Sequence, residues 1–409
     1  MDEGPTPPPP LRSALIAALE RATSERVDDL AFFRGPAQRG TGTPARVRLA
    51  TRELVVKLPV TATELHWFRQ LGERGDSVAR LIASGDRLGD PVGERDIRWI
   101  ALERLPHETP LHTPDPRDTE RLAAAAARFA HAARQRDHAT RQQGDATRQR
   151  DHAARQQDEC TLDDWPPRLE AAIAAVDAWH RTSTSAPARR WRALHALVMR
   201  ELPALAETWR HRAAPEWIHG ELHPRHARTR SAVPSAPMIL TDLASVRRGH
   251  WIEDAIDFER HFWTQPDLLR AARPLRAIAR ARRAHGLPLA RPDARLDLDG
   301  EDDDGYLPLA RIRRLLVAAA APQRPSPEPV FHGVFHGVSQ GAFPAAFLAA
   351  CLSQAERALR ELGVLPPRGT RAPESDGAPG ADGTPQAVLL ETLDPARAPL
   401  HQGPKPPLR

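Results

Sequence analysis

The feature that most constrains the fold of this chain is a change in hydrophobic pattern near Pro106. Upstream of it, four short segments have the composition of β-strands: residues 47–49, 54–58, 78–84 and 97–102. A single segment with helical spacing interrupts them, and Thr61 or Thr63 can cap its start. Sequential short strands with one inserted helix favour an antiparallel sheet with that helix packed against it, so we expect such a unit here.

Downstream, the chain is expected to be mostly helical, with helices at residues 165–179, 187–209, 252–285, 307–320 and 343–362. The sequence thus predicts an α+β protein with a small, sheet-containing N-lobe over residues 11–105 and a mainly helical C-lobe over residues 106–366. We expect the N-lobe to open with a helix over residues 11–30. Residues 1–10 and 367–409 are rich in Pro and are predicted to be disordered.

Residues 134–160 are an exception to the helical pattern. The run Arg-Gln-Arg-Asp-His-Ala at residues 134–139 recurs at residues 148–153, and this spacing of fourteen residues is close to four helical turns. No apolar stripe continues after Ala133. We therefore predict a low-complexity, solvent-exposed insertion that is helical or frayed.

The charge of the chain is basic, with a formal net charge of +5 and an isoelectric point of about 10.0. This can indicate an anionic partner such as nucleic acid. However, Lys57 and Lys405 are the only lysines, so the charge reflects a general bias toward Arg. Aromatic residues make up 5% of the chain and do not alternate with basic ones as single-strand binding requires. We expect no nucleic-acid partner, and we interpret Lys57 as retained for a chemical role that the wider Arg fork cannot fill.

Apolar runs, the N-terminal residues and the cysteines bear on where in the cell the protein is located. No run of about 18 apolar residues occurs, and residues 1–10 lack a basic start followed by an apolar stretch. We therefore expect no membrane partner and no secretory signal. Cys160 and Cys351 are the only cysteines and lie far apart, which argues against a disulfide framework. The simplest interpretation is a cytoplasmic protein, and its oligomeric state is left open.

The segment richest in candidate catalytic and metal-binding side chains is residues 218–226, Ile-His-Gly-Glu-Leu-His-Pro-Arg-His. A Pro- and Ser-rich turn separates it from a second strand, which ends at Asp242. Because a hairpin brings the ends of its two strands together, we expect Glu221, His226 and Asp242 to lie close in space.

Another candidate functional residue, Lys57, lies in the predicted strand at residues 54–58. Side chains alternate between the two faces of a strand, so Val55 and Lys57 share one face. The following helix carries Glu64 next to a predicted buried stripe formed by Leu65, Phe68 and Leu71.

In these segments the sequence resembles the aminoglycoside phosphotransferase-like kinases, which are relatives of the protein kinases. Their catalytic loop reads His-Gly-Asp-Leu-His-x-x-Asn, and this chain matches it at His219, Gly220, Leu222 and His223. Asp242 matches the family's second Asp, at the end of the following hairpin. The resemblance covers about residues 34–362 and implies the two-lobed protein-kinase-like fold. It also implies that Asp254, in a later Gly-x-x-x-x-Asp stretch, supports the loop.

The resemblance implies a nucleotide site as well. Lys57 and Glu64 correspond to the family's strand Lys and helix Glu, and Val55 would line the adenine pocket. ATP is the implied nucleotide, with GTP as an alternative. Mg²⁺ would be bound by Asp242 and by His226.

For the reaction itself, the resemblance implies that Glu221 orients or deprotonates a hydroxyl of a small-molecule substrate, with His219 beside it in the loop. Two departures from the family pattern bear on this role. Glu221 replaces an Asp and is one methylene longer, and a misplacement of about 1 Å can cost roughly a hundredfold in rate. His226 replaces an Asn, whereas magnesium prefers oxygen ligands.

The leading prediction is therefore an ATP-dependent phosphotransferase that moves the γ-phosphate to a small-molecule hydroxyl. A catalytically impaired pseudokinase or nucleotide-binding regulator is one alternative. A metal-dependent hydrolase using His219, Glu221 and His223 is a second. His332 and His336 are four residues apart and form a weaker metal candidate, because two glycines disfavour a helix there. No segment identifies the substrate.

Overall fold

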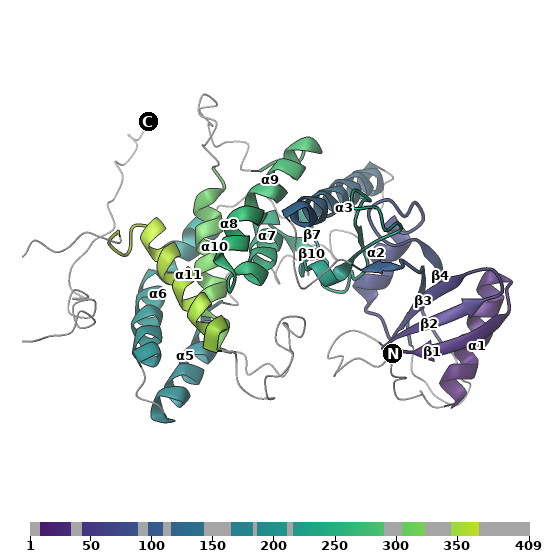
Figure 1. The fold of residues 1–409 in the computed structure, drawn as a ribbon, viewed down its shortest axis with the longest axis horizontal. Helices are drawn as coiled ribbons and strands as arrows, with labels where there is room; N and C mark the ends of the chain where they lie inside the picture. Colours follow the sequence, from purple (N-terminus) through teal and green to yellow (C-terminus); the bar gives the residue numbers. More distant parts are fainter. Residues whose placement is uncertain are drawn as a thin grey trace, which may run out of the picture.

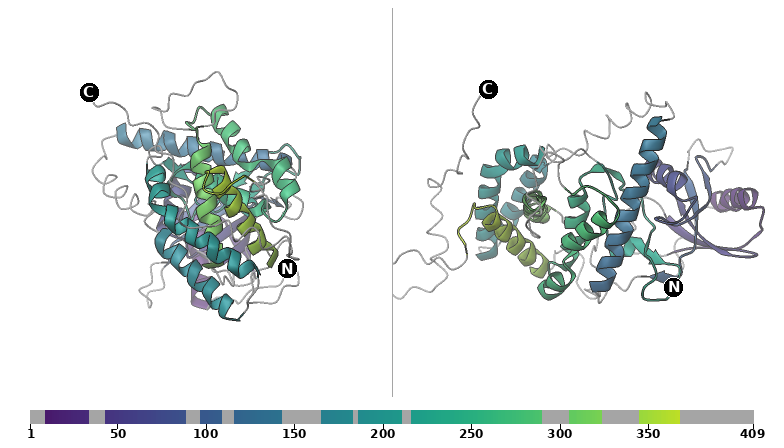
Figure 2. Two further views of the ribbon diagram at one scale, coloured as in Figure 1. Left: turned by 90° about the vertical axis from the view of Figure 1, so that its left-hand side faces the viewer. Right: turned by 90° about the horizontal axis from the view of Figure 1, so that it is seen from above.

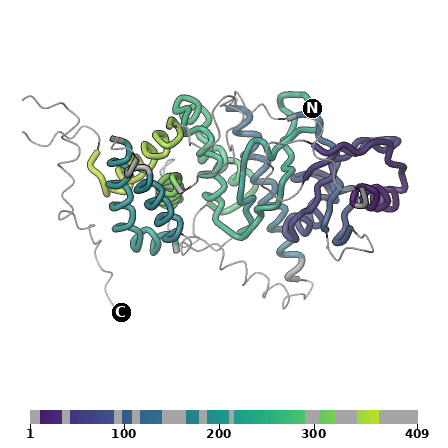
Figure 3. The backbone as a smooth tube through the Cα atoms, turned by 90° about the horizontal axis from the view of Figure 1, so that it is seen from below, coloured from purple at the N-terminus to yellow at the C-terminus, as the bar shows by residue number. Residues whose placement is uncertain are grey.

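The computed structural model describes residues 9–33, 43–88, 97–108, 116–142, 165–182, 186–210, 216–289, 305–323 and 345–367. The described part is elongated, with a five-stranded sheet at one end and a group of helices at the other (Figure 1, Figure 3). Helix α3, Pro116–Gln142, lies between these two parts (Figure 2). No helix among the described residues is both long enough and apolar enough to cross a membrane.

The sheet has the strand order β1-β2-β3-β5-β4, and each neighbouring pair is antiparallel. Its strands are β1 Val27–Phe32, β2 Thr43–Leu49, β3 Glu53–Leu58, β4 Leu81–Gly85 and β5 Trp99–Glu103. Burial alternates along β3 as predicted, with Val55 and Lys57 half-buried on one face. The opposite face of β3 is fully buried, and its residues are Leu54, Val56 and Leu58.

Two helices cover opposite faces of this sheet. Helix α1, Pro9–Thr23, buries Leu15 and Leu19 in a cluster that includes Ala101 of β5. Helix α2, Ala62–Leu71, buries Phe68 in a different cluster that includes Ile100, the neighbour of Ala101. Because successive side chains of a strand point to opposite faces, α1 and α2 lie on opposite sides. The face covered by α2 is the one that carries Lys57.

The predicted helix over residues 11–30 is wrong after Thr23. Ser24 has a left-handed φ of 57°, which ends the helix. The next residues form β1, where Leu30 and Phe32 are buried with a period of two and pair with β2. The helix also begins at Pro9, inside the predicted disordered N-terminus.

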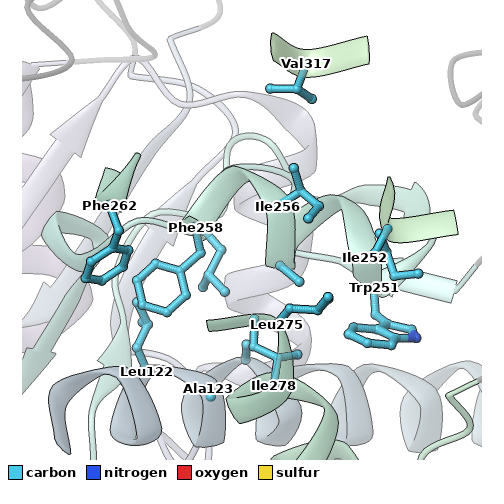
Figure 4. Close-up of a cluster of buried hydrophobic side chains, with 14 of the residues drawn as sticks. Leu122, Ala123, Trp251, Ile252, Ile256, Phe258, Phe262, Leu275, Ile278 and Val317 are labelled. Atoms are coloured by element: carbon cyan, nitrogen blue, oxygen red, sulfur yellow. The ribbon is translucent and has the colours of Figure 1, made fainter. Parts of the chain in front are cut away.

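Beyond the sheet the chain is mainly helical. Its helices are α3, α5 Trp165–Thr182, α6 Ala186–Arg210, α7 Trp251–Glu259, α8 Pro266–Ala272, α9 Pro274–Ala284, α10 Leu307–Ala319 and α11 Ala345–Glu361. Five short strands accompany them: β6 His107–Glu108, β7 Glu216–Ile218, β8 Ala227–Thr229, β9 Ile239–Leu240 and β10 Arg247–Gly249. Side chains of α7 such as Ile252 and Ile256 pack among those of α3, α9 and α10 (Figure 4).

The single helix predicted over residues 252–285 is wrong, because this stretch forms α7, α8 and α9. Pro266 and Pro274 each stand at the first position of a new helix, where the missing N–H is tolerated. Between α8 and α9, Arg273 adopts a left-handed conformation with a φ of 44°. Both prolines are helix-start signals in the sequence, and the single predicted helix passed over them.

The predicted insertion at residues 134–160 is helical as far as Gln142, which is one of the two forms predicted for it. Helix α3 continues to Gln142, so the first part of the repeat is an ordered helix. Within it, Asp137 accepts two hydrogen bonds from Arg248 Nη2, at 3.0 and 2.9 Å. Residues 143–160 lie outside the described residues, as do residues 1–8 and 368–409 of the predicted disordered ends.

The architecture confirms the predicted fold class, with a small antiparallel sheet in the N-lobe and a mainly helical C-lobe. The predicted limits of the lobes stay predictions.

A buried ion pair between α7 and α10 gives a test of this packing. Arg314 donates from Nε and Nη2 to the two carboxylate oxygens of Glu259, at 2.7 and 3.0 Å, and both side chains are at most 10% exposed. Arg314→Met leaves a buried carboxylate without its main partner and is expected to lower the free energy of unfolding by about 3–5 kcal/mol. The double variant Arg314→Met/Glu259→Leu should recover most of that loss in urea denaturation.

The matched control is Arg270→Met, which removes an exposed ion pair with Asp267 and should leave the unfolding midpoint unchanged. A double variant as unstable as Arg314→Met alone would show that the pair is not the source of the effect.

Candidate active site

The catalytic loop, residues 219–226, connects β7 to β8. Strands β8 and β9 pair antiparallel, so the predicted hairpin is confirmed. Directly after β9, the backbone N–H of Thr241 donates to the carbonyl of His226 at 2.9 Å. This contact brings the loop next to Asp242, with His226 Nε2 at 3.9 Å from Asp242 Oδ2.

The hairpin is attached to the N-lobe by backbone and side-chain bonds. The N–H of Leu240 donates to the Ser77 carbonyl at 3.3 Å, and the Ala79 N–H donates to the Leu240 carbonyl at 3.0 Å. Beyond β8, Arg230 Nε donates to a carboxylate oxygen of Glu103 at 3.0 Å, at the end of β5. The N-lobe and the hairpin therefore hold Asp242 facing the sheet.

Lys57 joins the two parts of the site. Its Nζ donates to Glu64 Oε1 at 2.8 Å and to Asp242 Oδ1 at 3.2 Å. Glu64 is fully buried, the Lys57 side chain is 14% exposed and the Asp242 side chain is 34% exposed. Val55, on the same face of β3 as Lys57, is half-buried. The structure thus brings together the predicted nucleotide residues with one predicted metal ligand.

The charges in this group influence one another. Burial alone would lower the pKa of Lys57, but the carboxylates of Asp242 and Glu64 outweigh it and raise that pKa. Burial alone would raise the pKa of Asp242, but Lys57 and His226 hold it at about 2. For Glu64, burial prevails over the attraction of Lys57 and raises the pKa to about 7. Asp242 is therefore ionised at neutral pH and presents its charge toward solvent.

The catalytic loop is held by Asp254, at the start of α7. Its Oδ2 accepts from the His219 N–H and its Oδ1 from the Gly220 N–H, both at 2.8 Å. Gly220 has a φ of 80°, and a Cβ there would stand 2.0 Å from the Ser245 carbonyl oxygen, so only glycine fits. The supporting role implied for Asp254 is confirmed by these bonds.

Glu221 is the accessible carboxylate of the loop, with a side chain that is 50% exposed. Its Oε1 accepts from Arg225 Nη2 at 3.1 Å, and its Oε2 accepts from the Ser245 hydroxyl at 3.3 Å. A carboxylate in this position can receive a proton from a bound hydroxyl group.

The ring of His226 is engaged at both nitrogens. Nε2 accepts from Arg225 Nε at 3.1 Å, so Nδ1 carries the proton that is donated to the Glu221 carbonyl, also 3.1 Å away. Burial lowers the pKa of His226 to about 4, although Asp242 opposes the shift. The ring is neutral at physiological pH, and its one lone pair is directed at Arg225.

The other two histidines of the loop are buried. His219 stacks on His226 with ring centroids 5.9 Å apart, and burial lowers its pKa. His223 Nδ1 accepts from the Arg225 N–H at 2.9 Å, and its ring lies 3.8 Å from that of His261. Both rings therefore brace the loop and do not face solvent as an exposed acid or base would.

The residues of the hydrolase alternative, His219, Glu221 and His223, are neighbours in the loop. Among the described residues, however, no group of three or more His, Cys, Asp or Glu side chains is arranged to hold a metal ion. The pair His332 and His336 lies outside the described residues.

Sequence reasoning did not single out Arg225, which contacts both Glu221 and His226. Its spacing of four residues from Glu221 was a weak signal, because residues at that distance meet only when the chain turns between them. The 3₁₀ turn Pro224–His226 provides this turn.

The pH dependence of stability tests the environment of Asp254. Burial raises its pKa to about 7, while the His219 and Gly220 N–H groups oppose the shift. In the unfolded chain the carboxyl group of Asp254 has its ordinary pKa of 3.8. The folded state therefore gains stability from holding the Asp254 proton, and this gain is complete below pH 3.8 and is lost as the pH rises toward 7. Asp254→Asn does not titrate and loses one acceptor, so it should be less stable by about 1–3 kcal/mol at pH 5.

The deficit of Asp254→Asn relative to the unsubstituted protein should shrink between pH 5 and pH 8 in denaturation experiments. A deficit that stays constant over this range would mean that Asp254 is ionised throughout and that its pKa is not raised.

Comparisons with known proteins give matches among solved structures alone. No family model and no curated protein matches the chain. Of the solved structures, spectinomycin phosphotransferase with ADP and spectinomycin has 11% identity and a TM-score of 0.45, over 76% of this chain and 86% of that one. A putative aminoglycoside phosphotransferase from Ralstonia eutropha has 14% identity and a TM-score of 0.46, over 85% of this chain and 95% of that one. A microcompartment-associated aminopropanol kinase has 12% identity and a TM-score of 0.44, over 85% of this chain and 97% of that one.

With these TM-scores below 0.5, the similarity is too low to carry a function, which has to come from the chain's own residues.

Proposed function

We propose that this protein is an ATP-dependent phosphotransferase that transfers the γ-phosphate to a hydroxyl group of a small molecule. The observation that carries the proposal is the shared ammonium group of Lys57, bonded to Glu64 at 2.8 Å and to Asp242 at 3.2 Å. Phosphoryl transfer needs cations on the phosphates, a hard-oxygen ligand for magnesium and a carboxylate near the attacking hydroxyl. Lys57, Asp242 and Glu221 supply these three elements.

The donor set fits one magnesium ion. Asp242 is ionised, a third exposed and made of the oxygen atoms that magnesium prefers. His226, the second predicted ligand, does not fit in this arrangement, because it offers nitrogen and its lone pair accepts from Arg225. Bound at Asp242, magnesium would neutralise charge on the nucleotide phosphates. Lys57 would bind a phosphate oxygen, and Val55 would contact the base, ATP or alternatively GTP.

In the reaction, Glu221 orients the acceptor and takes its hydroxyl proton. The acceptor oxygen forms a bond to the γ-phosphorus, and the bond from that phosphorus to the β–γ bridging oxygen breaks. ADP leaves with the bridging oxygen, and the phosphorylated acceptor is the second product. The buried loop histidines and Asp254 keep Glu221 in position during this step.

A second candidate is a nucleotide-binding pseudokinase. The observation in its favour is that the Glu221 carboxylate is already bonded to Arg225 and Ser245. If Arg225 does not release it, nucleotide binds and no transfer follows.

Nucleotide binding is tested by thermal shift with ATP, with and without magnesium. A ligand at 100 times its Kd that binds only the folded chain adds about 2.7 kcal/mol of stability. We expect a rise in Tm that requires magnesium and is absent in Lys57→Met. The control is Arg69→Met, which removes a cation paired with Asp86 on the same lobe and should keep the shift. No shift at saturating ATP or GTP in the intact protein would contradict the proposal.

Transfer is tested by ADP release with a panel of hydroxyl acceptors. Glu221→Gln should keep the nucleotide-dependent thermal shift and lose about 10²–10⁴ in kcat, because the amide cannot accept the proton. Asp242→Asn should lose both the magnesium-dependent part of the shift and turnover. Unchanged turnover in Glu221→Gln would remove Glu221 from the mechanism, and nucleotide binding without any transfer would favour the pseudokinase.

A further inference from the structure

Arg225 occupies a position between the proposed base and the neighbouring histidine. Its Nη2 donates to Glu221 Oε1 at 3.1 Å and its Nε donates to His226 Nε2 at 3.1 Å. Its backbone is anchored as well, because its N–H donates to His223 Nδ1 at 2.9 Å. The loop therefore directs the guanidinium group toward Glu221 and His226.

The contact with His226 determines what this position can bind. The Nδ1 proton of His226 goes to the Glu221 carbonyl, which leaves Nε2 as the single acceptor, and Arg225 occupies it. A metal ion at residue 226 would need this same lone pair. On the other side, Asp242 Oδ2 lies 3.9 Å from Nε2. Hence the site offers hard-oxygen ligation at Asp242 and, beside His226, the guanidinium cation of Arg225 in place of a second metal ion.

The exposure of the pair leaves room for Arg225 to change partners. The side chains of Arg225 and Glu221 are 39% and 50% exposed. An ion pair with this degree of exposure contributes little to the free energy of unfolding. The planar guanidinium fork binds phosphate oxygens through two parallel hydrogen bonds. When a phosphate group enters beside Glu221, Arg225 can move to it and free the Glu221 carboxylate to accept the hydroxyl proton.

We propose that Arg225 is a catalytic residue of this site, which contacts the phosphoryl group in transfer and supplies the positive charge that a second metal ion at residue 226 would otherwise provide. The inference rests on the proposed phosphotransferase function. It predicts a phosphotransferase that works with one divalent ion per chain.

The number of ions is measured with Mn²⁺ as the probe, by electron paramagnetic resonance titration of the full chain with a non-hydrolysable ATP analogue. One bound Mn²⁺ per chain is expected, and its affinity should fall in Asp242→Asn and be unchanged in His226→Ala. Two bound Mn²⁺, with one lost in His226→Ala, would overturn the inference and leave the proposed function standing. No nucleotide binding at all would overturn both.

The role of the cation is measured by chemical rescue of ADP release from ATP, with water as the acceptor. Arg225→Ala should lose about 10³ in kcat, the lower range for an arginine that stabilises this transition state. Added guanidinium ion should raise the kcat of Arg225→Ala at least tenfold and should leave the kcat of Glu221→Gln unchanged. Arg69→Ala removes an arginine that is as exposed as Arg225 and is paired with Asp86, and it should keep full activity. Full activity of Arg225→Ala, or a loss that guanidinium does not rescue while the variant still binds nucleotide, would refute the inference.

Discussion

One ammonium group shared by two carboxylates connects the parts of this protein that matter for its chemistry. Lys57 comes from the central strand of the sheet, Glu64 from the helix beside it and Asp242 from a hairpin of the other lobe. When both carboxylates are ionised, the group carries one excess negative charge, and Asp242 is the member that meets solvent. Such a charge, next to a half-buried cation, suits a divalent ion together with an anionic ligand.

Around this network, the site divides into a fixed frame and two exposed side chains. The frame consists of backbone bonds from β9 to the N-lobe and of the two N–H groups that Asp254 accepts. The side chains of Glu221 and Arg225 extend from the loop that these bonds hold, and both remain exposed. Glu221 and His226, the two residues at which the sequence differs from the loop pattern that it resembles, are linked through Arg225, which bonds to both side chains. Two features that are separate in the sequence therefore form one unit in space.

Much of the fold and of the site followed from local patterns. The alternation in β3 placed Lys57 and Val55 on the face away from the α1 core. Of the two predicted caps of α2, Thr61 and Thr63, it is Thr61 whose hydroxyl accepts from the Glu64 N–H, at 3.0 Å. The turn-rich segment before Asp242 predicted the β8–β9 hairpin. These features depend on residues that are neighbours along the chain, and so periodicity, caps and turns reveal them.

What the sequence determined by itself is therefore the α+β class, the two faces of β3 and the hairpin that brings the loop of residues 219–226 next to Asp242. Only the tertiary structure decided that β1 pairs with β2 and is not helical, that Asp137 of the repeat binds Arg248 across 111 residues, and that Arg225 takes the lone pair of His226. In each case the partner is supplied by another element or by a turn whose geometry local propensity does not specify. The free energy of such contacts arises from burial and charge pairing in the folded chain, and for that reason no local pattern records it.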